Sequence, residues 1–469
     1  MTTATAFDTL AIRWQCQPGT ESLVERLIQL PERTHIKSTK AKEVVRVELN
    51  DVTYFIKFYR NHEIPLRPLK FYFKSSQARQ EWETALALES LQIPIVKHIA
   101  LGERWSRTGL QESILITEGF DGLSLRYSSH WDPIQLGAFL DRLLDAGVLH
   151  GDLHPSNILA HRETAEFRLV DLYQIAIKES LSEEEKQHSK AILAMHLPIP
   201  VSRTTFLLSR QLRWKAVQKR ARRCLRENQD FGTIRIGDRT WQVSKALIQD
   251  PIKARFNQLD EAFQSAPNLL KDGRSSTVTR LPEGAVLKRY NFKKRLNYIK
   301  DFFRLSRGKR SFLNAYHLEI VDIPTARGIA TADIRKATGA RQSYFAMEDL
   351  SQAVHLLDWQ GDRHTLIQAT AQLIAHLHNE AFSHRDLKAT NIMLDPDGTA
   401  YLIDLDGLEF KGTLPPIKLV ASDLRRLYHD GEKHLAAQPS EKRAFLRTYL
   451  RARDVTPYGL KTIVKTWQY

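Results

Sequence analysis

The feature that most constrains this chain is an internal repeat. The segment HGDLHPSNIL begins at His150, and the segment HRDLKATNIM begins at His384. Five matched pairs of residues lie 230 to 234 positions apart: Lys57 with Lys288, Pro94 with Pro324, Glu118 with Glu348, Asp152 with Asp386, and Asp171 with Asp404. A register held this closely over most of both halves predicts two tandem copies of one fold.

The length of the chain fits a duplication. At 469 residues it exceeds what one ordinary hydrophobic core organises, and two or three domains are the expected number. An apolar content of 42% is that of a globular protein. We predict a first domain over residues 1–200, a basic amphipathic linker helix over residues 201–226 and a second domain over residues 227–469.

Composition also bounds the compartment and the partners. The two cysteines, Cys16 and Cys224, cannot form a disulfide framework or a zinc site, which favours the reducing cytosol. The N-terminus lacks the basic and apolar regions of a signal peptide, and no run approaches the roughly 18 apolar residues of a membrane helix. We therefore expect a cytoplasmic protein whose membrane association would be peripheral. A net charge of +15 indicates an anionic partner.

The first copy opens with the pattern of an antiparallel sheet. From Glu43 the sequence VVRVELNDVTYFIKFY gives two strand-like runs around an Asn-Asp turn, which predicts a hairpin. Lys57 stands inside the second run, where a lysine is costly unless an anion meets it. Glu81, in the helical segment that follows, is the candidate partner. Taken alone, Lys57 would be an edge-strand lysine in solvent and Glu81 a solvated helix residue.

An Asp-Asn-Asp set in each copy suits phosphoryl transfer. One acid can take the proton from an attacking hydroxyl, while an amide and a second acid hold the Mg²⁺ that bridges the nucleotide phosphates. The set is Asp152, Asn157 and Asp171 in the first copy, and Asp386, Asn391 and Asp404 in the second. The alternative is a chance Asp-rich turn between strands. The apolar runs over residues 392–394 and 401–403 stand where flanking strands should be, and they favour the site.

These residues resemble a known superfamily. The order of lysine strand, helix, I-P-[IT], H-[GR]-D-L-x-x-x-N and [VI]-D is similar to that of protein-kinase-like proteins. Within them, VLKRYN, RSFLNAYHLEIVDIPTA and LIDLDGLEF resemble the bacterial lipopolysaccharide kinase family, which phosphorylates heptose or Kdo sugars of the lipopolysaccharide inner core. The resemblance covers most of the second copy and, more loosely, the first. It implies an α+β fold of two tandem bilobal kinase-like domains, each with a small antiparallel-sheet N-lobe and a mainly helical C-lobe.

The resemblance also implies ATP and Mg²⁺ as cofactors and a cytoplasmic enzyme acting on an anionic glycolipid at the inner membrane. Carried over residue by residue, it assigns the α/β-phosphates to Lys57 and Lys288, with Glu81 as the partner of Lys57. It makes Asp152 and Asp386 the catalytic bases, places Glu118 and Glu348 at the adenine hinge and Gly273 in the loop over the phosphates, and assigns the metal to Asn157, Asp171, Asn391 and Asp404.

The two copies depart from the family pattern at different places. Neither has G-x-G-x-x-G, and only the second has a glycine in that region, Gly273 in KDGRSST. Glu81 aligns with Ser311, so the second strand lysine should lack its glutamate. Ser189 stands in the first copy where the second has Asp423, at a position that often braces the catalytic loop. We therefore expect the second copy to be the catalytic one.

The segment after the metal Asp indicates the class of acceptor. Protein kinases carry a long activation segment ending in A-P-E, which forms a peptide platform. Here Asp404 is followed closely by the helix that holds Asp423, and no A-P-E is present. A small-molecule or glycan hydroxyl is therefore the favoured acceptor. A protein kinase and a nucleotide-binding pseudokinase scaffold in envelope biogenesis are the alternatives, and the intact Asp-Asn-Asp sets count against the scaffold.

Three stretches concentrate basic residues. Between the copies lie Arg203, Arg210, Arg213, Lys215, Lys219, Arg220, Arg222, Arg223 and Arg226, with no acid among them. A basic amphipathic helix can lie on an anionic membrane. The favoured alternative for its apolar face, which includes Trp214, is packing as the last helix of the first copy. The basic-aromatic runs at 57–74 and 288–310 could stack on nucleic-acid bases, but no nucleic-acid-binding signature accompanies them.

Overall fold

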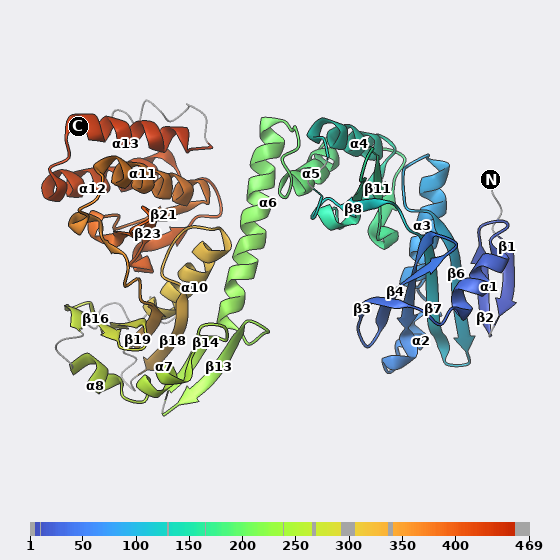
Figure 1. The fold of residues 1–469 in the computed structure, drawn as a ribbon, viewed down its shortest axis with the longest axis horizontal. Helices are drawn as coiled ribbons and strands as arrows, with labels where there is room; N and C mark the ends of the chain where they lie inside the picture. The colour runs from blue at the N-terminus through green and yellow to red at the C-terminus, as the bar shows by residue number, and fades with distance from the viewer. Residues whose placement is uncertain are drawn as a thin grey trace. The chain divides into compact units, whose positions relative to one another are not determined.

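This protein was analysed as a computed structural model, which describes residues 5–9, 11–128, 131–164, 166–237, 239–264, 269–291, 305–335 and 341–454. The chain forms two compact units, Met1–Leu212 and Arg213–Tyr469. In each of them an antiparallel sheet precedes a lobe that contains most of the longer helices (Figure 1).

The first unit begins with a seven-stranded antiparallel sheet, ordered β1-β2-β6-β7-β5-β4-β3. Its strands are β1 (Thr5–Thr9), β2 (Ile12–Cys16), β3 (Thr34–Ser38), β4 (Lys42–Leu49), β5 (Val52–Arg60), β6 (His98–Ser106) and β7 (Gly109–Glu118), and its helices are α1 (Glu21–Gln29), α2 (Arg67–Lys70) and α3 (Gln77–Ser90). Strand side chains alternate between two faces. One face packs Ile56 against Val24 of α1, and the other packs Tyr59 with Trp82 of α3.

The second lobe of this unit has its own core. It contains β8 (Gly122–Ser124), α4 (Pro133–Asp145), β9 (Val148–His150), β10 (Ile158–His161), β11 (Phe167–Leu169), β12 (Ile175–Ile177) and α5 (Glu183–Ala194). Helix α4 begins where Asp132 accepts a hydrogen bond from Gln135 N and Pro133 takes the first helical position. Its apolar stripe, with Leu136 and Leu140, packs on the strands that flank the first Asp-Asn-Asp set.

The second unit repeats this architecture. Its seven-stranded sheet has the matching order β13-β14-β18-β19-β17-β16-β15. The strands are β13 (Phe231–Ile236), β14 (Arg239–Ser244), β15 (Leu269–Asp272), β16 (Ser276–Leu281), β17 (Ala285–Tyr290), β18 (Gly328–Arg335) and β19 (Arg341–Glu348), and the helices are α7 (Asp250–Arg255), α8 (Leu259–Gln264) and α10 (Arg307–Ile320). The equivalent strand order is structural support for the duplication.

The second lobe of the second unit is larger than that of the first. It contains β20 (Val354–His355), α11 (Arg363–Asn379), β21 (Phe382–His384), β22 (Ile392–Leu394), β23 (Ala400–Leu402), β24 (Leu408–Phe410), α12 (Ile417–Leu435) and α13 (Pro439–Arg451). Helices α12 and α13 pack on α11 through an apolar cluster that includes Leu424, Phe445 and Ile374. The predicted α+β class with two tandem two-lobed domains is confirmed.

Helix α6 (Arg203–Ala221) corrects one prediction. We expected its apolar face to pack as the last helix of the first copy. Trp214 and Ala221 are instead buried in the second unit, and Val217 packs against that unit's core cluster. Arg213 forms an ion pair with Glu380, which is also in the second unit. Residues 203–212 of α6 do fall in the first unit. From Arg213 onward the prediction was wrong, because an amphipathic pattern shows that a face is buried but not which partner buries it.

The basic-aromatic run at 288–310 is only partly visible, because residues 292–304 lie outside the described residues. Where it is described, Arg307 and Arg310 are engaged in ion pairs with Asp406. Within the described part of the chain, no helix combines the length and apolar content needed to cross a membrane.

The placement of α6 yields a stability prediction. We expect Trp214→Ala to lower the free energy of unfolding of the second unit by about 3–5 kcal/mol, because it empties a buried site. Phe206→Ala, on the same helix but 39% exposed, should change it by less than about 1 kcal/mol. Denaturant unfolding, with backbone hydrogen exchange as the residue-level readout, shows which unit loses stability. Destabilisation confined to the first unit would contradict the placement of α6.

Candidate active site

A lysine on an interior strand anchors the site of the first unit. Strand β5 pairs on both sides, and Lys57 lies opposite Val44 of β4 and Leu115 of β7. The lysine is therefore not on a sheet edge. Its Nζ lies 2.8 Å from Glu81 Oε1 on α3 and 2.6 Å from Asp171 Oδ1. The ion pair expected between Lys57 and Glu81 is present.

Burial and charge oppose each other in this pair. Burial disfavours the charge of Lys57, but the carboxylates of Glu81 and Asp171 outweigh burial and raise its pKa. Burial would likewise raise the pKa of Glu81. The ammonium of Lys57, with the imidazole of His98 3.6 Å away, outweighs that effect and lowers the pKa of Glu81 to about 2. Both groups are consequently charged at neutral pH.

The second unit keeps the lysine and loses the glutamate. Lys288 on β17 is 6% exposed, and its Nζ lies 2.6 Å from Asp404 Oδ1. Burial acts to raise the pKa of Asp404, but Lys288 outweighs burial and lowers it. Ser311 stands on α10 where the first unit has Glu81, and its Oγ lies 2.6 Å from Tyr290 Oη. The loss of the glutamate expected from the sequence is seen in the structure.

The two catalytic-loop asparagines have the same geometry. Asn157 Nδ2 donates to the backbone oxygen of Asp152 at 2.8 Å, and Asn391 Nδ2 donates to that of Asp386 at 2.8 Å. Each asparagine ends a short 3-10 turn and directly precedes a short strand, β10 or β22. Because the amide nitrogen is committed to the loop, the amide oxygen is the group left to act as a ligand.

The second acid of each set sits in a strained backbone conformation. Asp171 and Asp404 both have φ of +57°, which non-glycine residues adopt rarely and aspartate adopts more readily than most. Each follows a strand, β11 or β23, that pairs in parallel with the repeated Ile-Pro segment, through Ile95 in one unit and Thr325 in the other. This pairing connects the sheet lobe to the strand that leads, two residues later, to the acid. The carboxylate is thereby directed to the strand lysine.

The loop histidine fixes the site of the second unit further. Asp386 N donates to His384 Nδ1 at 3.2 Å, and His384 Nε2 lies 3.1 Å from Asp404 O. Burial lowers the pKa of His384, which favours the neutral ring. A neutral ring that accepts at Nδ1 carries its proton on Nε2 and can donate it to Asp404 O. One side chain thus connects the proposed base to the proposed metal ligand.

Helix α12 braces the second catalytic loop at two points. Asp423 Oδ2 accepts a hydrogen bond from His384 N at 2.8 Å, and Asp430 Oδ2 accepts one from Ala389 N at 2.7 Å. The bracing suggested for Asp423 is therefore present, whereas Ser189 of the first unit has no carboxylate to offer. Sequence reasoning missed Asp430. Its spacing of seven residues from Asp423, which returns to the same helix face, could have revealed it.

Lys388 was also missed as a site residue. Its Nζ lies 2.7 Å from Asp386 Oδ1, so a positive charge stands beside the proposed base of the second unit. In the first unit His154 takes the matching position in the sequence. The signal was a lysine two residues after the aspartate.

The other predicted residues lie at the rim of the site. Glu118 and Glu348 end strands β7 and β19, and their carboxylates pair with Lys97 and Arg327. Their side chains are thus engaged, and so are their backbone N–H groups, which donate to Lys97 O at 2.9 Å and to Arg327 O at 3.0 Å. Gly273 lies between β15 and β16, where its N donates to Ser276 O at 3.1 Å.

The residues present fit ATP and Mg²⁺. Each site offers an amide oxygen and a carboxylate, which are hard oxygen ligands of the kind that Mg²⁺ takes alongside phosphate oxygens. Asn157 with Asp171, and Asn391 with Asp404, would hold the ion. The strand lysine, part-buried in the first unit and buried in the second, would supply the positive charge that nucleotide phosphates require.

The sequence matches the lipopolysaccharide kinase (Kdo/WaaP) family over residues 26–196 and again over residues 273–449. The chain belongs to this family. Each matched segment falls in one unit, so the Kdo/WaaP pattern is present twice, and the family resemblance seen in the sequence is confirmed.

Similar proteins include the 3-deoxy-D-manno-octulosonic acid kinases of Xanthomonas euvesicatoria pv. vesicatoria (strain 85-10) and Xanthomonas oryzae pv. oryzae (strain PXO99A). Each is 34% identical over 110 residues, covering 23% of this chain and 42% of the relative. Among solved structures, WaaP in complex with acyl carrier protein has a TM-score of 0.35 at 18% identity, covering 47% of this chain and 97% of that one. The bifunctional kinase-methyltransferase WbdD has a TM-score of 0.25 at 17% identity, covering 42% and 48%.

The lowered pKa of Glu81 generates a pH prediction. Folding lowers this pKa from about 4.3 in an unfolded chain to about 2. The stabilising contribution of Glu81 is therefore complete above about pH 5 and is lost as the pH falls towards 2. We expect Glu81→Gln to destabilise the first unit by about 3 kcal/mol at pH 7, and the difference from wild type to shrink steadily below pH 4. Urea unfolding between pH 2 and 7 measures this difference.

Glu83→Gln is the matched control, since Glu83 lies on the same helix with a 57% exposed side chain 3.8 Å from Arg79. Its effect should stay below about 0.5 kcal/mol at every pH. A destabilisation by Glu81→Gln that does not depend on pH would show that the charge of Glu81 contributes nothing.

Proposed function

We propose that this protein is an ATP-dependent phosphotransferase that phosphorylates a sugar hydroxyl, heptose or Kdo, of the lipopolysaccharide inner core. The observation that carries the proposal is the convergence, in each unit of a Kdo/WaaP family chain, of an interior-strand lysine with the second acid of an Asp-Asn-Asp set. That convergence joins a phosphate-binding cation to metal-binding oxygens and to a base on the neighbouring loop.

The second unit carries most of the chemistry in this proposal. Lys288 binds the α- and β-phosphates of ATP, and Asn391 and Asp404 hold Mg²⁺. When bound, Mg²⁺ neutralises charge on the phosphates. The carboxylate of Asp386 accepts the proton of the sugar hydroxyl as that oxygen bonds to the γ-phosphorus, and the bond from the γ-phosphorus to the β,γ-bridging oxygen breaks, so that ADP leaves. Lys388, which is 2.7 Å from Asp386, adds positive charge where the phosphoryl group passes.

The short segment after the metal Asp supports a glycan acceptor. In the second unit β24 ends at Phe410 and α12 begins at Ile417, and in the first unit β12 ends at Ile177 and α5 begins at Glu183. Neither interval has room for the long platform on which protein kinases bind peptides. The net charge of +15 suits the phosphorylated core of a glycolipid.

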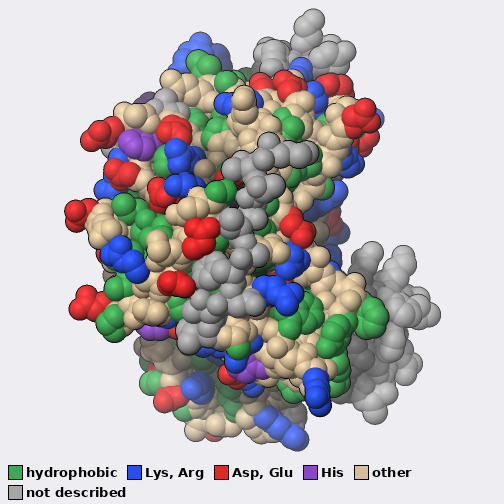
Figure 2. Space-filling model, turned by 90° about the vertical axis from the view of Figure 1, so that its right-hand side faces the viewer, with side chains coloured by type: hydrophobic (Ala, Val, Ile, Leu, Met, Phe, Trp, Pro, Cys, Tyr) green, Lys and Arg blue, Asp and Glu red, His purple; other side chains and the backbone are tan. Residues whose placement is uncertain are grey.

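The basic helix supports action at the cytoplasmic membrane face. Basic and acidic side chains are interspersed over the face seen in Figure 2, whereas α6 carries basic side chains and no acidic ones. The exposed cations of α6 and the turn after it are Arg203, Lys215, Lys219, Arg220, Arg222 and Arg223. Phe206 and Leu207 on the same helix are partly exposed. Cations with neighbouring apolar groups are what an anionic lipid surface attracts.

The division of labour between the units can be measured by replacing each base. We expect Asp386→Asn to reduce transfer of labelled phosphate from ATP to core oligosaccharide by about 100-fold or more, because it removes the general base of the braced site. Asp152→Asn should reduce transfer only several-fold. Equal and complete loss from either change would contradict this division. Label appearing only on protein would overturn the glycan acceptor, and transfer to no acceptor would favour a nucleotide-binding scaffold.

Attachment to the membrane should depend on salt. Full-length protein should bind vesicles of phosphatidylglycerol and phosphatidylcholine at low salt and leave them as the salt rises past about 0.15 M, where the Debye length is about 8 Å. Lys215→Gln with Lys219→Gln should lower the affinity at low salt, since both side chains are exposed. Co-sedimentation measures both effects. Binding that is insensitive to salt would contradict electrostatic attachment.

A further inference from the structure

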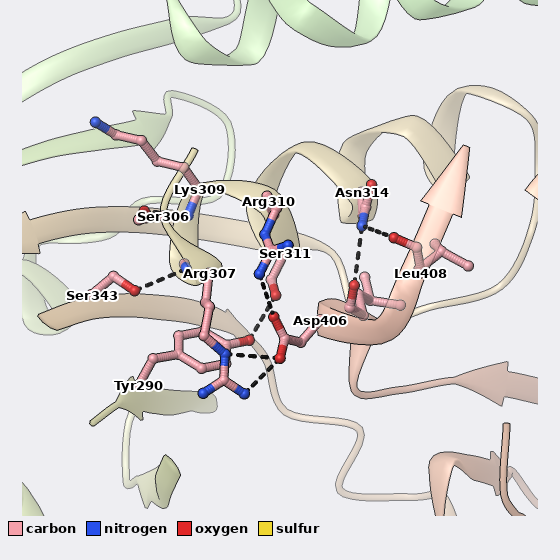
Figure 3. Close-up of polar contacts among 12 residues, drawn as sticks. Tyr290, Ser306, Arg307, Lys309, Arg310, Ser311, Asn314, Ser343, Asp406 and Leu408 are labelled. Carbon is pink, nitrogen blue, oxygen red and sulfur yellow. Dashed lines mark hydrogen bonds and ion pairs between the residues drawn. The ribbon is translucent and has the colours of Figure 1, made fainter. Parts of the chain in front are cut away.

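Two arginines of α10 grip the loop that carries the metal-binding acid of the second unit (Figure 3). Arg307 donates to Asp406 Oδ2 through Nε at 2.8 Å and through Nη2 at 2.5 Å. Arg310 Nη2 lies 3.1 Å from the other carboxylate oxygen, Oδ1. The three side chains are between 19% and 32% exposed. Charge-assisted bonds of this kind are stronger and more directional than neutral ones.

The same face of α10 makes further bonds to that loop. Asn314 Nδ2 donates to Leu405 O at 3.0 Å and to Leu408 O at 3.1 Å. Arg307, Arg310 and Asn314 are spaced i, i+3 and i+7, so they project from one side of the helix. This side of α10 is therefore committed to residues 405–408, immediately after Asp404.

Arg307 also connects two other parts of the site. Its Nη1 donates to Ser275 O at 2.9 Å, in the loop between β15 and β16 that contains Gly273. Its guanidinium lies 4.6 Å from the ring centroid of Tyr290 on β17. The close approach of α10 to the sheet depends on Gly308, because a Cβ there would meet Tyr344 O at 2.5 Å. Arg307 thus contacts three parts of the site: the β15–β16 loop, the strand that carries Lys288, and residues 405–408 after Asp404, which we call the metal loop.

The first unit carries different side chains at the positions that match Arg307, Arg310 and Asp406. Helices α3 and α10 each begin after a capping serine, Ser76 or Ser306, 230 residues apart. In that register Gln77, Gln80, Glu81 and Thr84 match Arg307, Arg310, Ser311 and Asn314. In the 233-residue register of Asp171 and Asp404, Tyr173 matches Asp406. In the first unit the helix carries an acid that pairs with the strand lysine. In the second unit the helix instead carries two arginines that pair with Asp406. The side chains with which the helix holds the site are therefore cationic in the second unit and anionic in the first.

We propose that Arg307 and Arg310, by binding Asp406, take over in the second unit the positioning role that Glu81 has in the first. They hold α10 against the metal loop, so that Asp404 stays in its left-handed conformation facing Lys288. They also offset the charge of Asp406, which would otherwise stand as an unpaired carboxylate beside the Lys288–Asp404 pair. Neither arginine touches the reacting atoms; both are positioning residues. The inference rests on the proposed function of the second unit and concerns how that site is kept in order.

The test uses the full chain carrying Asp152→Asn, so that transfer reports on the second unit. We expect Arg307→Gln with Arg310→Gln to lower kcat about 10- to 100-fold and to raise the KM for Mg·ATP several-fold, because Lys288 and Asp404 lose their fixed geometry. The reversed pair, Arg307→Asp with Asp406→Arg, should recover at least tenfold over either single reversal. Lys309→Gln is the control, since Lys309 projects from another side of α10 and pairs with Asp333 of β18. It should leave kcat and KM unchanged.

A second readout needs no turnover. Backbone hydrogen exchange over residues 405–408, measured with Mg·ADP bound, should speed up at least tenfold in Asp406→Asn and stay unchanged in Lys309→Gln. Unchanged exchange in Asp406→Asn, or a reversed pair no better than the single reversals, would overturn the inference. If the chain carrying Asp152→Asn transfers no phosphate, the proposed function of the second unit fails. The exchange rates and the affinity for Mg·ADP then still decide whether the arginines position the loop.

Discussion

Each unit depends on a lysine on an interior strand of its sheet, part-buried in the first unit as Lys57 and buried in the second as Lys288. A lysine on an interior strand is costly unless a carboxylate meets it. In both units that carboxylate belongs to the second acid of the Asp-Asn-Asp set, at 2.6 Å from Lys57 or Lys288. In each unit the ion pair therefore joins the sheet to the second lobe. The left-handed conformation of Asp171 and Asp404 directs each carboxylate across that junction.

The two copies hold the helix of the sheet lobe in different ways. In the first unit Glu81 on α3 is buried and pairs directly with the strand lysine. In the second unit Ser311 replaces that glutamate, and α10 binds the metal loop through Arg307 and its neighbours. The second unit also braces its catalytic loop with α12, through Asp423. Duplication within the Kdo/WaaP family has thus preserved the reactive set while the supports around it diverged.

Much of the fold and of the candidate site was predictable from the sequence, and each incorrect or missing prediction has a physical cause. The Lys57–Glu81 pair was expected because both residues lie in short, strongly patterned elements of one lobe, and the same comparison exposed its loss at Ser311. The roles of the Asp-Asn-Asp residues in catalysis and metal binding stay predictions. The packing of α6 from Arg213 onward was assigned to the wrong copy, because the pattern around Trp214 gives the buried face of a helix without its partner. Asp430 was missed because nothing local marks it as a hydrogen-bond acceptor for the loop.

The sequence by itself determined the duplication, the α+β class and the family, and it identified both Asp-Asn-Asp sets as candidates. These rest on spacing along the chain, which local motifs preserve. Only the tertiary structure decided which charges meet. Arg307 and Asp406 are 99 residues apart, and their pairing follows from the close approach of α10 to β19 at Gly308. A charge pair over such a distance is set by how two elements pack, and a run of basic residues gives no sign of whether it faces solvent or an acid inside the fold.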